Sequence, residues 1–243
     1  MQHDELIDAL RREGEALGEV PLADVDVPTC PEWSLPQLIT HVGEAHRFQE
    51  AQLRAPSPDR LVRADRAGEL DLDGIDDWYH TGFESLLATL AGTDPDQPTP
   101  TWFGPRPATF WARRAAHETA IHRWDAEAAV SAASELVPDQ AIDALSELLG
   151  VFAPVLFDPS GWAGDAATIH LHATDVDGEW LIGMGPDGLV VEHRHEKGDV
   201  AARGTASDLV LMMMGRVPPA RLEVFGEASV IDRWHRMVQL RGR

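Results

Sequence analysis

Apolar side chains recur every three or four positions along much of the first part of the chain, which is the spacing that places them on one face of an α-helix. The first such stretch carries Leu6, Leu10 and Leu17 among charged residues. A later stretch starts with the sequence of a capping box, in which Ser34 and Gln37 would exchange side-chain to backbone hydrogen bonds. The pattern predicts helices over residues 3–17, 35–53, 75–90, 107–130 and 138–152.

After about residue 158 the pattern changes to the alternation of apolar and polar residues that is typical of β-strands. Turn pairs at Asp177-Gly178 and Asp187-Gly188 separate the short runs. The predicted elements are strands over residues 168–174, 179–182, 189–191, 200–205 and 222–225, and helices over residues 209–214 and 231–240. We therefore expect an α+β protein with a helical domain at residues 1–157 and a small mixed α+β domain at residues 158–243.

The composition and net charge of the chain limit the kinds of molecule that it is expected to bind. The chain has 243 residues, 44% of them hydrophobic, as in an ordinary globular protein. Its formal net charge of −21 would repel nucleic acid and anionic membranes. No window approaches the ~18 apolar residues of a membrane span, and the polar, acidic first residues do not resemble a signal peptide. We expect a cytoplasmic monomer or weak dimer that acts on small molecules, with a single cysteine, Cys30, and hence no intrachain disulfide.

The helix predicted over residues 107–130 carries the first candidate chemistry. Glu118 and His122 lie one turn apart on it, on a face shared with Trp111 and Ala115, so this face is expected to point inward. A buried carboxylate and imidazole need a partner, and a divalent metal ion would satisfy both. The alternative is an ordinary i,i+4 pair on the surface.

A metal site needs a third ligand. His41 is the leading candidate, because helical spacing puts it on one face with Leu38 and Phe48, which we take to be the core-facing stripe. His46 lies about 140° further round this helix and points elsewhere. The alternative is that His41 is a core histidine that hydrogen-bonds to a neighbour, and His80 is a weaker candidate ligand.

Two features of the second half have plain interpretations. His170 and His172 share a strand face, but no acidic neighbour with clear geometry is evident, so an exposed strand face is the preferred interpretation. Met212-Met213-Met214 is most simply the core side of a helix, and a methionine-lined pocket is the alternative.

The chain resembles the mycothiol-dependent maleylpyruvate isomerase family. The residues that carry the resemblance run through nearly the whole chain in order: Val27-Pro-Thr-Cys-Pro-Glu-Trp-Ser34, His41, Trp111-Ala-Arg-Arg-Ala-Ala-His-Glu-Thr-Ala-Ile-His-Arg-Trp-Asp125, Leu171-His-Ala-Thr-Asp-Val-Asp-Gly-Glu-Trp180 and Gly204-Thr-Ala-Ser-Asp-Leu209. These motifs are specific for the family and not for a substrate, because many members of the family have no assigned reaction.

The resemblance implies a DinB-like four-helix bundle followed by a small domain of sterol-carrier-like topology. It also implies that zinc or a similar divalent ion is bound by His41, Glu118 and His122, the residues that helical spacing selects independently. By the same resemblance, the loop that ends at Trp33 would wall the cleft, so Trp33 is a candidate for binding the cofactor. The implied co-substrate is a low-molecular-weight thiol of the mycothiol type.

Two imidazoles and one carboxylate leave coordination positions open, which is the pattern of a catalytic site. Such a site would hold the sulfur of an incoming thiol as thiolate, ready to attack a small electrophile. We expect a metal-dependent enzyme of isomerase or S-transferase type, with Cys30 as an alternative fourth ligand. The rival interpretation is a non-enzymatic carrier of a small apolar ligand whose metal is structural.

An anionic substrate or a sugar-linked thiol needs a cationic donor despite the negative net charge. The last third of the chain contains several arginines. Arg216, which follows a predicted helix end at Gly215, is our candidate for a catalytic anion-binding residue. Arg221 is the second choice and a candidate for binding the thiol cofactor.

Overall fold

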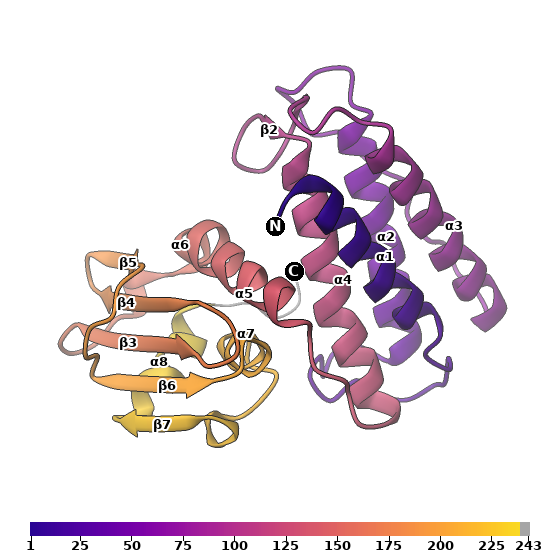
Figure 1. Cartoon of the computed structure of the whole chain (residues 1–243). Coiled ribbons are helices and arrows are strands. Elements are labelled where there is room, and N and C mark those ends of the chain that lie inside the picture. Colours follow the sequence, from indigo (N-terminus) through magenta and orange to yellow (C-terminus); the bar gives the residue numbers. More distant parts are fainter. Residues whose placement is uncertain (239–243) are drawn as a thin grey trace. The chain divides into compact units, whose positions relative to one another are not determined.

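The computed structural model describes residues 1–238 and divides into two compact units, one of residues 1–134 and one that begins at Glu135 (Figure 1). The first unit is helical and the second is built on a mixed β-sheet. The predicted α+β class is thus confirmed. None of the helices within residues 1–238 combines the length and the apolar character needed to cross a membrane.

Four helices make up the first unit, and the helical pattern predicted each of them to within a few residues. They are α1 (His3–Gly18), α2 (Leu35–Leu53), α3 (Leu72–Ala91) and α4 (Thr109–Val130). Helix α1 packs against α4, and α2 packs against both α3 and α4 (Figure 1). A small antiparallel pair, β1 (Pro98–Thr99) and β2 (Arg106–Pro107), was not predicted, because two-residue strands carry no measurable periodicity.

Helix α2 starts as predicted but is rotated relative to our expectation. The capping box is present, with the backbone N–H of Ser34 donating to Gln37 Oε1 at 2.9 Å. Its buried stripe, however, runs through Leu38, Val42 and His46, so His46 lies in the core and hydrogen-bonds to Thr119 at 2.9 Å. His41 lies at the edge of this stripe with 25% of its side chain exposed, which corrects the prediction that it faces the core.

Helix α4 is buried on almost every side, although many of its side chains are polar. Its buried polar residues include His117, Thr119, His122, Arg123 and Asp125. One enclosed ion pair joins Arg123 Nε to Glu13 Oε2 of α1 at 2.9 Å, and each side chain is less than 5% exposed. Because a buried charge needs a partner, this pair fixes α1 against α4.

The second unit contains a five-stranded sheet in the order β5-β4-β3-β6-β7, in which β3 and β6 are parallel and the other neighbours are antiparallel. The strands are β3 (Ala167–Ala173), β4 (Glu179–Gly185), β5 (Gly188–Glu192), β6 (Val200–Gly204) and β7 (Glu223–Gly226). Helices α7 (Ala206–Met213) and α8 (Ser229–Met237) pack against β3 on one face (Figure 1). Met212 and Met213 are completely buried, in keeping with a helix core.

The helical segment after residue 134 groups with the sheet. Helix α5 (Pro138–Glu147) continues through a π-helical turn, Leu148–Phe152, into α6 (Ala153–Leu156), and α5 packs against α7. The backbone N–H of Leu136 also donates to Ser207 Oγ at 3.0 Å. The compact units therefore divide earlier than the boundary that we placed after residue 157, and the limits of the functional domains stay a prediction. The end of the last predicted helix, at residues 239–240, lies outside the described residues.

The buried pair between α1 and α4 gives a stability prediction. Replacing Glu13 by alanine leaves the Arg123 guanidinium with only its second carboxylate, Glu127, at 2.9 Å. We expect a loss of about 3 kcal/mol in the free energy of unfolding, at the low end for breaking a buried pair. Urea denaturation followed by tryptophan fluorescence measures it. The control is Glu15→Ala, an exposed position on the same helix, with an expected change below about 0.5 kcal/mol. Equal losses in both variants would contradict the assigned role.

Candidate metal centre

The three side chains predicted as ligands lie together on two neighbouring helices. His41 comes from α2, and Glu118 and His122 come from successive turns of α4. His41 Nε2 lies 3.3 Å from Glu118 Oε1. One donor atom from each of the three residues lies within 4.8 Å of the other two. The packing of α2 on α4 thus converts the spacing in the sequence into one cluster of donors.

Asp125 hydrogen-bonds to one ring nitrogen of His122 and so fixes the orientation of the imidazole. The carboxylate is completely buried, and its Oδ2 lies 3.0 Å from His122 Nδ1. An ionised carboxylate can only accept hydrogen bonds, so Nδ1 carries the proton and Nε2 keeps its lone pair for a ligand role. No role was predicted for Asp125 from the sequence. A carboxylate three residues after a ligating histidine on a helix is the signal that could have found it.

Glu118 is held in its ionised form. Burial acts to raise the pKa of Glu118, but the charge of Arg114 and the hydrogen bond with His41 outweigh it and hold this pKa well below its ordinary value. Arg114 Nε lies 3.0 Å from Glu118 Oε2, which leaves Oε1 on the side of His41. Arg114 was not among the predicted site residues, although it lies one turn before Glu118 on the same helix.

The loop before α2 closes over the imidazoles. It folds back on itself, since Val27 N–H donates to Trp33 O at 3.0 Å and Trp33 N–H donates to Cys30 O at 2.8 Å. The Trp33 ring centroid lies 4.5 Å from that of His41 and 6.0 Å from that of His122. The structure therefore places Trp33 beside the cluster, while its role in binding a cofactor stays a prediction.

The same loop is tied to α4 through Asp125. Thr29 Oγ1 donates to Asp125 Oδ1 at 2.6 Å, and Cys30 Sγ lies 3.6 Å from Asp125 Oδ2. Cys30, His122 and Asp125 thereby form a second close group of donors. The thiol lies near enough to the centre for the alternative role of Cys30 as a ligand, and in this structure it donates to the carboxylate.

A divalent metal ion fits this donor set. Two imidazoles and an ionised carboxylate are common zinc ligands, and donors in a tetrahedral zinc site lie about 3.3 Å apart. The contact between His41 and Glu118 already has this length. The weaker candidate, His80, lies on α3 and pairs with Asp76 of its own helix at 3.5 Å.

Comparison with known proteins places the chain in a family. Residues 3–127 match the family model of the mycothiol maleylpyruvate isomerase N-terminal domain, and residues 139–233 match that of the MDMPI C-terminal domain. The chain belongs to this family. Curated protein sequences give no significant match.

Solved structures of the mycothiol-dependent maleylpyruvate isomerase share the fold. A histidine-to-alanine variant of that enzyme has a TM-score of 0.61 and 14% sequence identity, over 93% of this chain and 95% of the other. A second structure of the enzyme has a TM-score of 0.55 and 13% identity, over 89% and 90% of the two chains. At such low identity the likeness establishes the fold, and the chemistry has to be argued from the residues.

The two arginines predicted for this member of the isomerase family lie in the second unit. Arg216 follows α7, is half-buried, and donates to the carbonyl of Met214 at 3.1 Å. Arg221 is exposed, and its Nε lies 2.7 Å from Asp208 Oδ1, so part of its charge is already matched. Their roles in binding an anion or a thiol stay predictions.

The contact between Asp125 and His122 gives a test of metal affinity. We expect Asp125→Asn to weaken zinc binding at this centre by about 10- to 100-fold, because the amide no longer fixes the tautomer of His122. Competition against a chromophoric chelator measures the affinity, and circular dichroism checks that the helices are retained. Asp77→Asn, an exposed change on α3, is the matched control. An unchanged affinity in Asp125→Asn would remove Asp125 from the site.

Proposed function

We propose that this chain is a metal-dependent enzyme that uses a low-molecular-weight thiol of the mycothiol type for isomerase or S-transferase chemistry on a small electrophile. The observation that carries the proposal is the convergence of His41, Glu118 and His122, with their donor atoms within 4.8 Å of one another. Membership of the mycothiol-dependent family supports the choice of thiol. A cytoplasmic location, where such thiols are kept reduced, is part of the proposal.

We assign the metal to those three residues, with zinc first among the divalent ions. When bound, the ion lowers the pKa of a coordinated thiol and so supplies a thiolate at neutral pH. Glu118 contributes a negative charge kept ionised by Arg114, and His122 presents Nε2 because Asp125 holds its other nitrogen. Trp33 covers the imidazoles and shields the sulfur from water.

In this proposal the nucleophile is the thiol of the co-substrate, and the thiol of the protein's own cysteine is not the nucleophile. Cys30 is the chain's single cysteine, and its Sγ lies against the Asp125 carboxylate at 3.6 Å. The thiol is the donor in this contact, so its proton is engaged with the carboxylate. Cys30 thereby helps to hold the loop and Asp125 in place.

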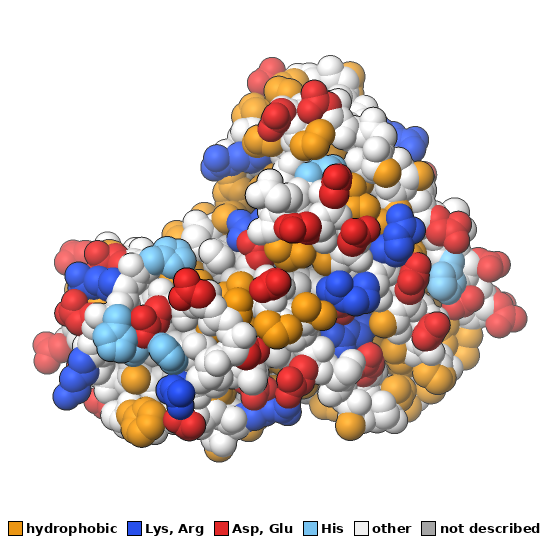
Figure 2. Space-filling model, in the orientation of Figure 1, with side chains coloured by type: hydrophobic (Ala, Val, Ile, Leu, Met, Phe, Trp, Pro, Cys, Tyr) orange, Lys and Arg blue, Asp and Glu red, His pale blue; other side chains and the backbone are white. Residues whose placement is uncertain are grey.

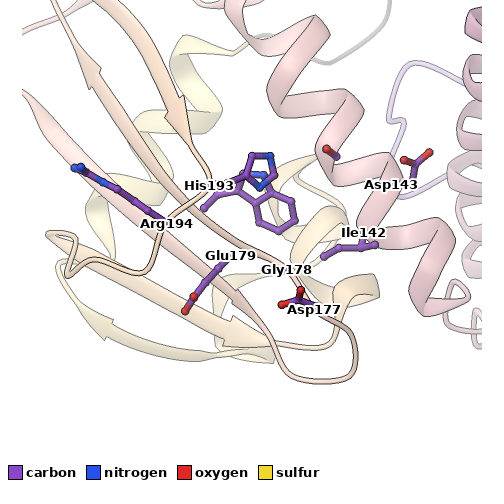
Figure 3. A pocket seen from close by; sticks show the side chains of 9 residues that line it. Ile142, Asp143, Asp177, Gly178, Glu179, His193 and Arg194 are labelled. Carbon is purple, nitrogen blue, oxygen red and sulfur yellow. The ribbon is translucent and has the colours of Figure 1, made fainter. Parts of the chain in front are cut away.

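The carrier hypothesis requires an apolar cavity in the second unit. One pocket in the described part of this unit has a volume of about 400 Å³ and lies between α5 and the end of the β3–β4 hairpin (Figure 3). Most of its lining is polar, including Asp143, Ser146, Asp177, Glu179 and Arg194. Such a lining does not suit an apolar ligand, so the pocket gives the carrier hypothesis no support.

A thiol-dependence screen tests the proposal. Metal-loaded protein is incubated with a panel of small electrophiles, maleylpyruvate among them, with and without mycothiol or a simpler thiol. We expect turnover only when thiol is added, because a free thiol with a pKa near 8.5 is only a few per cent ionised at neutral pH. His122→Ala, which removes a ligand, should abolish this turnover. In the cobalt-substituted protein, added thiol should change the visible absorption spectrum.

Cys30→Ser is the control for the source of the nucleophile. The serine hydroxyl can still donate to Asp125, so we expect activity within a few-fold of the parent protein. Turnover that persists without added thiol and disappears in Cys30→Ser would reverse the assignment and make Cys30 the nucleophile.

Arg216 is the subject of a separate prediction. If it binds an anionic group of the substrate, Arg216→Ala should keep the metal and lose about 10- to 100-fold in kcat/KM, because a charge-assisted hydrogen bond contributes roughly 1.5 to 3 kcal/mol. Metal analysis and steady-state kinetics measure the two effects. Arg221→Ala is the comparison, since Asp208 already pairs with that side chain. Full activity in Arg216→Ala with a loss in Arg221→Ala would transfer the role to Arg221.

A further inference from the structure

A second cluster of imidazoles around a carboxylate lies in the second unit. His170 and His172 are two residues apart on β3, so both side chains project from the same face of the sheet. The register places Glu179 of β4 directly opposite His172. The interpretation of these histidines as an exposed face without an acidic neighbour was therefore wrong, because the neighbour comes from the next strand.

Three imidazoles converge on a single oxygen atom, Glu179 Oε1. It lies 2.6 Å from His172 Nδ1, 3.2 Å from His170 Nε2 and 2.5 Å from His195 Nδ1. One donor atom each from His170, Glu179 and His195 lies within 4.8 Å of the other two. Two strands and a loop thus supply four side chains to one point.

The loop that carries His195 is fixed to strand β3 by hydrogen bonds and by a close backbone approach. Residues 193–199 lead from β5 at one edge of the sheet, past β4 and β3, to β6. The Asp199 carboxylate accepts hydrogen bonds from the backbone N–H and the hydroxyl of Thr168, both at 2.8 Å. At Gly198 a Cβ atom would lie 2.9 Å from the backbone nitrogen of His170, so only glycine allows this approach. These contacts bring His195, three residues earlier, over His170.

The side chains of this cluster become more exposed to solvent with distance from the sheet. His170 is 8% exposed, whereas the His195 side chain is 78% exposed. Histidine side chains gather on this face of the sheet in the space-filling view (Figure 2). An ion can therefore enter from the His195 side, and the net charge of −21 favours the approach of a cation.

Glu179 is held ionised. Hydrogen bonds from His195 and then from His172 lower the pKa of Glu179 to about 2. Figure 3 shows this side chain directed away from His193.

We propose that His170, Glu179 and His195 form a second binding site for a divalent transition-metal ion of the zinc type, with His172 positioning the carboxylate. Two imidazoles and a carboxylate suit zinc better than the oxygen-seeking calcium or magnesium ions. The donors already lie within 4.8 Å of one another, and the exposed His195 side chain can adjust its position toward the spacing of about 3.3 Å between donors in a tetrahedral zinc site. A bound ion would fasten the loop of residues 193–199 to the sheet.

This site is independent of the proposed function, because it uses none of the residues of the helical centre. Zinc binding is measured by titration calorimetry on the full chain carrying His41→Ala and His122→Ala, which lacks the helical site. We expect one zinc ion per chain to remain bound in this parent. The reverse pair, His170→Ala with His195→Ala in the otherwise unchanged chain, should keep only the helical site. Each double variant therefore tests one site without depending on whether the other binds zinc.

Single variants in the same parent separate ligands from neighbours. His195→Ala should weaken zinc binding by more than about 100-fold, and His172→Ala by the 10- to 100-fold typical of a residue that positions a ligand. His193→Ala is the matched control in the same loop and should change nothing. His195 is exposed, so its removal is tolerated even if His170→Ala does not fold. No zinc binding tighter than about 1 mM in the parent, or equal affinities in His195→Ala and His193→Ala, would overturn the proposal.

Discussion

Helix α4 is buried along most of its length while carrying charged and polar side chains on several faces, and this constraint governs the helical unit. Every such group must meet a partner, because a buried charge without one costs several kcal/mol. Arg123 therefore fixes α1 through Glu13, and Thr119 meets His46 of α2. Asp125 draws in the loop before α2 through Thr29 and Cys30. The candidate metal centre forms where these fixed elements meet.

The helices could be predicted because their evidence is local. The boundaries of α2 follow from a capping box and an apolar period, both contained in the same short stretch. Glu118 and His122 were predictable for the same reason, since one helical turn joins them. The rotation of α2 was not, because both His41 and His46 suit an apolar face. Packing against α4 decides between them, and it gives His46 the buried hydrogen bond to Thr119.

In both units, contacts between side chains that are far apart in the sequence could not be predicted. Thr29 and Asp125 are 96 residues apart, and no pattern in either segment points to the other. Glu179 stands near His172 in the sequence, but its position depends on the strand register, and that of His195 on the path of a connection across the sheet. Side-chain alternation identifies which residues share a face of one strand. It does not identify which strand lies beside it.

The two clusters share a physical property that bears on how tightly either could hold a metal ion. In each, an imidazole already contacts a carboxylate oxygen: His41 lies 3.3 Å from Glu118, and His195 lies 2.5 Å from Glu179. A metal ion must replace these contacts, and it releases a proton wherever the ligating nitrogen carries one. Its measured affinity is therefore the difference between coordination and the hydrogen bonds that it replaces. His122 is the exception, because Asp125 holds its Nδ1 and leaves Nε2 available without any such exchange. On this ground the helical centre is better prepared for a metal ion than the sheet cluster, whose carboxylate oxygen is shared by three imidazoles.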